Sequence, residues 1–216
     1  MDRSELKLLA KQQIQGNIGT LLLINICMFA ISYIAQIIVS VFSESQNPAL
    51  MLIGIGLSFV ISFVTLPLAL GLLVTYINLS KGIKPNVNML FSRFSIFLKA
   101  FGLYFMTGLF IFLWSLLFII PGIIKSLSYA MAPYIMAENP EVGVFEAINK
   151  SKKMMDGHKW EFCVLQLSFI LWIMLGIVTC GLAYIYVMPY MQMTVVNFYN
   201  KVKGSELDTE QVYVEQ

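Results

Sequence analysis

The sequence predicts an all-α membrane protein with six transmembrane helices, arranged as three hairpins, and with amphipathic helices on its cytoplasmic surface. Three observations support this prediction: an apolar composition, long stretches almost free of charge, and a one-sided distribution of Lys and Arg. Hydrophobic residues make up 58% of the 216 residues and charged residues 12%, about half the charged share of a soluble domain. The mean hydropathy of +0.78 is typical of a polytopic membrane protein.

Three stretches with almost no charge set the number of spans. Residues 18–79 contain only Glu44, residues 100–137 contain only Lys125, and residues 162–200 contain no charged residue. At about 1.5 Å per helical residue, the last two stretches are each nearly twice as long as a ~30 Å hydrocarbon core, so each must be a hairpin of two spans. The predicted spans have the approximate bounds 18–42, 49–79, 100–120, 123–137, 162–178 and 182–200.

Gly, Pro and small polar residues predict the turns inside the hairpins, at Ser43–Pro48, at Pro121-Gly122 and at Thr179-Cys180-Gly181. All six spans then form one polytopic domain, residues 1–203. The acidic segment 204–216 is predicted to be a disordered tail. The three Cys residues lie inside apolar runs without metal-binding spacing, so we expect small buried side chains and neither a disulfide framework nor a metal site.

The distribution of Lys and Arg predicts that both termini are cytoplasmic. With six spans, all but one of the 14 Lys and Arg residues fall on the inner side, in segments 1–17, 80–99, 138–161 and 201–216. The exception is Lys125. This asymmetry is the main determinant of membrane topology. A five-span alternative, with residues 123–137 lying at the interface, would place the four Lys residues of 138–161 outside.

Three polar segments have amphipathic character, namely residues 2–15, 87–97 and 139–157. In the last segment, Asn139 and Pro140 predict the start of a helix. The apolar side of that helix is formed by residues that recur at helical spacing, Val144, Ile148, Ser151 and Met155. A helix of this kind is expected to lie on the inner membrane surface, with its apolar side docked on the bilayer or on neighbouring spans.

The chain also shows signs of a threefold repeat, in which each unit is an amphipathic segment, a span, a turn and a span that contains Pro. Counted from Pro67 and from Pro189, identical residues recur at Val74 and Val196, Asn78 and Asn200, Lys81 and Lys203, and Gly82 and Gly204. The alternative is coincidence, because membrane helices use few residue types.

Several motifs together resemble a bacterial integral-membrane family catalogued as domain of unknown function 975: RSELKLLA, PGIIKSLSY, AINKSKKMMDGHKWEF, LSFILW and MPYMQMTVVNFY. The resemblance covers nearly the whole chain. It implies a multi-pass protein of the bacterial plasma membrane and no established activity. A second pattern is similar to the membrane domain of some glycerophosphodiester phosphodiesterases and implies a lipid-related function; it consists of Pro121-Gly122, Pro133, Glu138, Ala147, Ser151 and Gly157.

The residues do not indicate an enzyme. The only His, His158, lies in a Lys-rich stretch next to a span, and no HExxH, GxSxG or P-loop motif is present. The acidic residues lie in tails, loops and surface segments, not deep in a span, which argues against a proton relay. We therefore expect no catalytic residue, no metal site and no cofactor, and the small net charge of +2 does not indicate a nucleic-acid partner.

We expect the protein to bind membrane lipids, anionic lipids among them, or a membrane protein partner. The binding surface would be an inner collar of cations, defined as Lys11, Lys81, Lys84, Arg93, Lys150, Lys152 and Lys153. Each cation next to an anionic leaflet gains about 1 kcal/mol. The alternative is that the collar serves only to set the topology.

A second functional hypothesis is a small transporter, or an export or immunity factor, with a cavity between the hairpins. Pro67, Pro133 and Pro189 are predicted to interrupt spans, although proline kinks are also ordinary packing features. Residues 123–137 measure only ~22 Å as a helix. We expect an outward-facing polar recess at this short span, lined by Lys125, Ser126, Ser128 and Tyr129; the alternative is that Lys125 only extends its side chain toward the interface.

Overall fold

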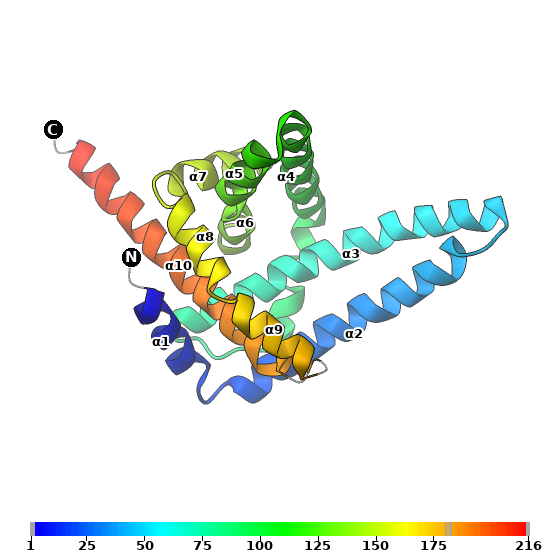
Figure 1. Cartoon of the computed structure of the whole chain (residues 1–216), viewed down its shortest axis with the longest axis horizontal. Coiled ribbons are helices and arrows are strands. Elements are labelled where there is room, and N and C mark those ends of the chain that lie inside the picture. Colours follow the sequence, from blue (N-terminus) through cyan, green and yellow to red (C-terminus); the bar gives the residue numbers. More distant parts are fainter. Residues whose placement is uncertain (1–2, 180, 182, 215–216) are drawn as a thin grey trace.

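The computed structural model describes residues 3–179, 181 and 183–214, with side chains described as far as Ser205. All elements in these ranges are helical, and none is a strand. The long helices pair as three hairpins (Figure 1): α2 (Ile18–Ser43) with α3 (Pro48–Ser80), α4 (Phe97–Leu117) with α5 (Ile119–Tyr129) and α6 (Ala132–Glu138), and α8 (Lys159–Leu167) and α9 (Ile170–Val178) with α10 (Tyr184–Val214).

Five segments in the described part of the chain are long and apolar enough to cross a membrane: Ile18–Ser43, Pro48–Ser80, Val87–Leu117, Ile119–Glu138 and Lys159–Val178. The all-helical class is therefore confirmed, and these helices fit the predicted membrane protein. Helix α10 occupies the position of the sixth predicted span. It is less apolar, because its first part contains several Tyr residues together with Gln192, Asn197 and Asn200.

The first hairpin forms a long arm that extends away from the rest of the molecule (Figure 1). Helix α2 ends at Ser43 and α3 begins at Pro48, as the sequence predicts. The side chain of Asn47 accepts a hydrogen bond from the backbone N–H of Ala49 at 3.0 Å. Pro48 fits the first helical position because its missing N–H would have no partner there.

The second hairpin turns at Phe118, so the prediction of a turn at Pro121-Gly122 was wrong. Phe118 has extended backbone angles (φ −157°, ψ 146°), and α5 begins immediately after it. Pro121 fits the first turn of α5 because the N–H groups there lack partners inside the helix. Gly122 has a packing role: a Cβ atom at this position would overlap the side chain of Ser115 in α4.

The predicted span 123–137 is divided into α5 and α6 at Ala130-Met131, two residues before Pro133. Ser151 bridges the break from the outside. Its Oγ atom donates to the carbonyl oxygen of Ser128 (2.8 Å) and accepts from the N–H of Met131 (3.1 Å). Ser151 is fully buried, so it provides partners for backbone groups that would otherwise be unsatisfied.

The third hairpin is divided as well, because α8 ends at Leu167 and α9 begins at Ile170. Phe169 at this break is fully buried and packs edge-on against Tyr190 of α10. The predicted turn falls partly on Cys180, which lies outside the described residues, and Gly181 has a φ of +92°. Helix α10 continues to Val214, and the disordered tail predicted from residue 204 stays a prediction. An existing helix extends easily through residues without Pro, since each added residue gains a hydrogen bond.

The polar segments form α1 (Arg3–Ile14), the short 3₁₀ helices η1 (Val87–Phe91) and η2 (Phe94–Ile96), and α7 (Val144–Met154). Helix α7 begins after Gly143, so the predicted start at Asn139-Pro140 was wrong; Asn139 instead ends α6. The predicted apolar side of α7 packs against α4, α5 and α6, and α1 packs against α10. These amphipathic faces therefore cover other helices, which is one of the two arrangements that the sequence predicted for α7.

This packing follows a cyclic pattern that agrees with the proposed repeat. Helix α7 packs on α6, η1 packs on α3, and α1 closes the cycle on α10, so each segment covers the proline-containing second part of the preceding hairpin. Ala10 in α1 and Ser151 in α7 are both fully buried. Six residues after each comes a glycine of positive φ, Gly16 (87°) and Gly157 (79°).

Candidate functional site

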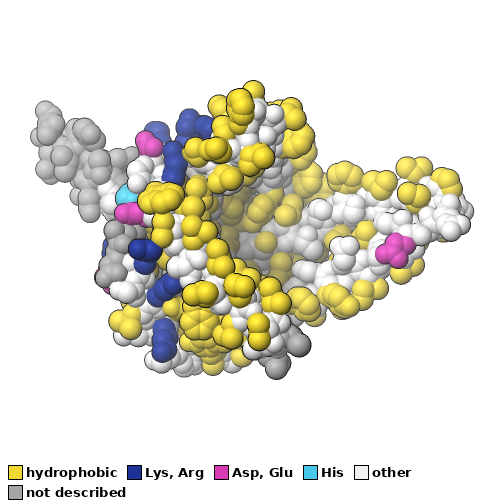
Figure 2. All heavy atoms as spheres, in the orientation of Figure 1, with side chains coloured by type: hydrophobic (Ala, Val, Ile, Leu, Met, Phe, Trp, Pro, Cys, Tyr) yellow, Lys and Arg dark blue, Asp and Glu magenta, His cyan; other side chains and the backbone are white. Residues whose placement is uncertain are grey.

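The Lys and Arg side chains gather at one end of the molecule, opposite the tip of the α2–α3 arm (Figure 2). This charged end is built from α1, α7, the last turns of α3 and α6, and the later part of α10. It carries the inner collar predicted from the sequence. The structure shows which of these cations have partners within the protein and which do not.

Glu138, the last residue of α6, is the centre of a charged network. Its carboxylate accepts hydrogen bonds from Lys81 Nζ (2.7 Å), Lys203 Nζ (2.8 Å) and the hydroxyl of Tyr199 (2.7 Å). The Glu138 side chain is 18% exposed. The carboxylate thus joins the ends of α3 and α6 to the middle of α10, and each of these three helices contains a proline. Arg93 adds a second link to α6, since its guanidinium donates twice to the carbonyl oxygen of Ala137.

Sequence reasoning placed Lys81 and Lys203 at equivalent repeat positions but did not assign their shared partner. One feature of the sequence could have indicated this partner. Glu138 is an acidic residue directly after the short span 123–137, in a chain whose inner segments are mostly basic. The network continues on the same side, where Asn200 Nδ2 donates to Ser80 Oγ at 2.8 Å. Lys81 and Asn200 are therefore structural residues that hold α3 against α10.

The replacement Glu138→Ala should destabilise the folded protein by about 2–4 kcal/mol, because two ammonium groups and a hydroxyl lose a largely buried partner. The measurement is the thermal unfolding midpoint of the purified protein in detergent. Glu141→Ala is the matched control, since Glu141 is exposed and its carboxylate has no partner in the described part of the chain. Equal midpoints for the two variants would show that the network contributes no stability.

The collar contains two kinds of cation. Lys81 and Arg93 belong to the network above, and Lys150 pairs with Glu146 at 2.8 Å along α7. Hydrogen bonding to Lys150 is the main cause that lowers the pKa of the Glu146 carboxyl. The other four side chains are exposed and have no partner among the described residues: Lys11, Lys84, Lys152 and Lys153.

A recess of about 380 Å³ lies at the junction of α7 and α8. Its lining consists of Asn149, Lys152, Lys153, Asp156 and Lys159. Lys159 Nζ lies 3.4 Å from Asp156 Oδ1, which is a long and exposed contact. Two collar residues without partners thus share one recess with a third cation, which the sequence analysis did not assign to the collar.

The structure does not bring the four predicted recess residues to one polar surface. Lys125 Nζ lies 4.6 Å from the centre of the Trp114 ring in α4. Ser126 and Ser128 donate to carbonyl oxygens within their own helix, and Tyr129 is buried next to Phe110. A cation over an indole ring gains about 0.5–2 kcal/mol. Lys125 therefore has a partner on the adjacent helix α4, which the sequence analysis did not identify.

The proline positions differ from one another. Pro133 lies in the first turn of α6, directly after the break in its span. Helices α3 and α10 continue through Pro67 and Pro189, so the structure does not show the predicted interruptions at these two residues. Both prolines lie in buried surroundings, where packing by neighbouring helices compensates for the missing hydrogen bond.

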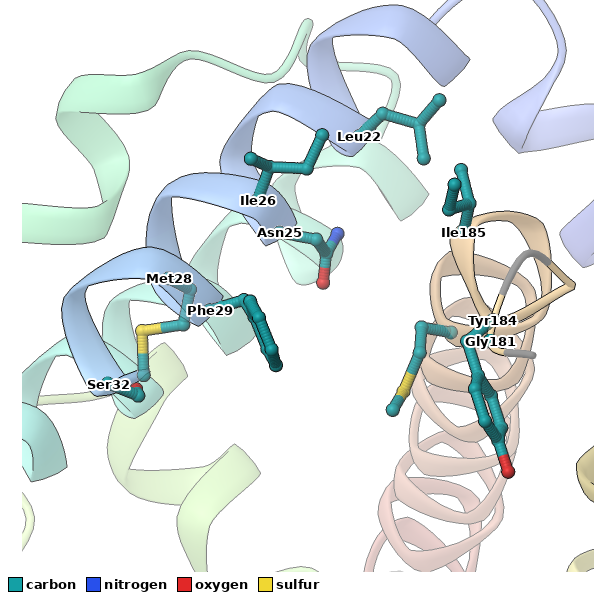
Figure 3. A pocket seen from close by; sticks show the side chains of 10 residues that line it. Leu22, Asn25, Ile26, Met28, Phe29, Ser32, Gly181, Tyr184 and Ile185 are labelled. Carbon is teal, nitrogen blue, oxygen red and sulfur yellow. The ribbon is translucent and has the colours of Figure 1, made fainter. Parts of the chain in front are cut away.

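A second cavity of about 530 Å³ lies between α2 and the start of α10 (Figure 3). Leu22 faces Ile185 at one end, and Phe29 and Tyr184 flank the other. The side chain of Asn25 donates to the Tyr76 hydroxyl and to the carbonyl oxygen of Leu21, both at 2.7 Å. No described residue of this lining is charged, so the cavity is suited to apolar groups.

Comparisons with known proteins complete the description of the site. Residues 117–206, which include α5 to α8, the recess and Glu138, match the model of a family described as "Protein of unknown function (DUF975)". No curated protein and no solved structure matches the chain. The resemblance to the membrane domain of glycerophosphodiester phosphodiesterases is not shown by these comparisons. The resemblance to the first family is confirmed over residues 117–206 of the chain.

Proposed function

We propose that the protein is a six-span protein of the bacterial plasma membrane, with both termini in the cytoplasm, that binds anionic lipid at its charged end without catalysing a reaction. The five apolar segments and the position of α10 support the spans. The gathering of Lys and Arg at one end supports the orientation (Figure 2).

The observation that carries this proposal is the group of exposed collar cations without partners in the described part of the chain: Lys11, Lys84, Lys152 and Lys153. A cation that only stabilises the fold would be expected to face an acceptor, as Lys81 and Arg93 do. At about 1 kcal/mol for each Lys next to an anionic leaflet, the four together favour anionic lipid by about 4 kcal/mol, roughly a thousandfold.

Replacing all four of these Lys residues by Gln should reduce the anionic lipid that copurifies with the protein, more strongly at low salt than at high salt because exposed charges are screened. Mass spectrometry of the purified protein measures the lipid. The double variant Lys150→Gln with Glu146→Gln is the control, since it removes a paired cation and leaves the net charge unchanged. An unchanged lipid content in the quadruple variant would leave topology as the only role of these cations.

Transport is a second candidate function, and one observation favours it. Figure 2 shows a hollow between the α2–α3 arm and the other two hairpins, while Glu138 ties the proline-containing helices together at the charged end. A hollow that is open on one side and closed on the other is the arrangement that alternating access requires. Solute flux into vesicles that contain the purified protein tests this function; vesicles without protein give the baseline.

A further inference from the structure

We infer that the recess between α7 and α8 is a specific site for the phosphate group of one anionic phospholipid. This inference rests on the proposed function, because it assigns to one place the lipid binding proposed for the whole charged end. The recess is lined by Asn149, Lys152, Lys153, Asp156 and Lys159 and has a volume of about 380 Å³.

The residues that line the recess are held together by the end of α7, the turn after it and the start of α8. Asn149, Lys152 and Lys153 follow the spacing i, i+3, i+4 and therefore share one face of α7. Asp156 follows in the turn directly after the helix. The opposite face is fixed in the core, since Ala147, Ile148 and Ser151 are buried. Gly157, with a φ of +79°, then turns the chain so that Lys159 at the start of α8 joins the same recess.

The chemistry of this lining fits a phosphate group. Each Lys carries three N–H donors, and the amide of Asn149 adds further donors, whereas a phosphate oxygen only accepts. Lys152 and Lys153 have no partner among the described residues, and the Lys159–Asp156 contact of 3.4 Å is at the long end for a hydrogen bond. Helix α8 begins without a side-chain cap, so the positive end of its dipole lies beside Lys159.

The depth of the recess favours a lipid headgroup over a phosphate compound from solution. Lys159 is the first residue of the apolar segment Lys159–Val178. Trp160 follows it and is 74% exposed. Exposed Trp at the end of a membrane segment lies at the level of the headgroups. The phosphate of a phospholipid in the inner leaflet would therefore lie at the height of the recess.

Asp156 indicates which headgroup fits best. Its side chain is 83% exposed, and its carboxylate can accept a hydrogen bond from a second group of a ligand in the recess. A phosphodiester that carries a hydroxyl group provides that donor. A phosphomonoester adds negative charge next to the carboxylate, which is unfavourable. We therefore expect phosphatidylglycerol to bind more tightly than phosphatidic acid.

The test uses the full-length protein in vesicles of phosphatidylcholine that contain a small share of phosphatidylglycerol, with native mass spectrometry to count the phosphatidylglycerol that stays bound. Lys152→Gln with Lys153→Gln should weaken the binding of phosphatidylglycerol about thirtyfold, at about 1 kcal/mol for each Lys. The matched control is Lys11→Gln with Lys84→Gln, which removes the same charge from exposed positions outside the recess. Lys11 and Lys84 do not line the recess, so their contribution as collar residues is to lipid elsewhere at the charged end. The control should therefore lower the occupancy of the recess about twofold or less, through the general surface potential alone.

The outcomes distinguish a specific site in the recess from general lipid binding by the collar. Equal losses in both variants would overturn the specific site and keep lipid binding by the collar, while no loss in either would overturn both. A second arm compares phosphatidic acid with phosphatidylglycerol, and Asp156→Asn should remove the preference for the latter. A third arm adds inorganic phosphate to the parent protein: displacement of phosphatidylglycerol at equal concentration would show that the site takes phosphate from solution, against the inference.

Discussion

Gly71→Ala should be among the most destabilising single replacements in this protein, although it adds only one methyl group. Gly71 lies buried in α3 where η1 crosses the helix, and a Cβ atom there would overlap the backbone carbonyl group of Leu90. Leu90 is fully buried and belongs to a short helix whose start is fixed by Asn86, which accepts a hydrogen bond from the N–H of Asn88 at 3.1 Å. Burial of Leu90 and the Asn86 cap therefore oppose a shift of η1 away from α3.

We expect Gly71→Ala to lower the free energy of unfolding by about 3 kcal/mol or more, at the upper end of the usual range for overpacked sites. Gly56→Ala is a control in the same helix, because a Cβ atom at Gly56 would meet nothing within 4 Å. That replacement should be neutral or stabilising by up to about 1 kcal/mol through the higher helix propensity of Ala. Retention of monodisperse protein after heating, measured by size-exclusion chromatography, compares the two variants. Equal thermal resistance would contradict the observed packing of η1 on α3.

Composition and the uncharged stretches predicted the all-helical class. The turn at Ser43–Pro48 is found where the sequence places it, because Asn47 and Pro48 are local signals that need no tertiary contact. Local signals also misled at Pro121-Gly122. Proline is as suitable for the first turn of a helix as for a loop, and the choice depends on Gly122 packing against Ser115 of α4.

The charged network could not be predicted in the same way, because its members are far apart in the sequence. Glu138 contacts Lys81 and Lys203, which lie 57 and 65 residues away. Lys125 is a similar case: its prediction as part of a polar recess considered its neighbours in sequence, whereas its contact is Trp114 on the adjacent helix. The sequence analysis identified the cations of the collar. The structure then distinguishes the cations that have partners among the described residues from the cations that have none there.

The orientation of the spans should produce an all-or-none result in a topology experiment. Reporter enzymes that are active only outside the cytoplasm should be active when fused after Gln46 or Gly122. The same reporters should be inactive when fused after Pro85, after Pro140 or at the C-terminus. The physical reason is the cost of moving the basic segments 80–99 and 138–161 across the membrane, each of which carries four Lys or Arg residues.

The fusion after Pro140 tests the account most directly, because it decides on which side of the membrane Glu138, α7 and the recess lie. We expect the reporter at Pro140 to be cytoplasmic while the reporter at Gly122 is external, which places a full span between them. An external signal at Pro140 together with a cytoplasmic signal at Gly122 would contradict the six-span arrangement and would separate the free Lys residues from the anionic inner leaflet.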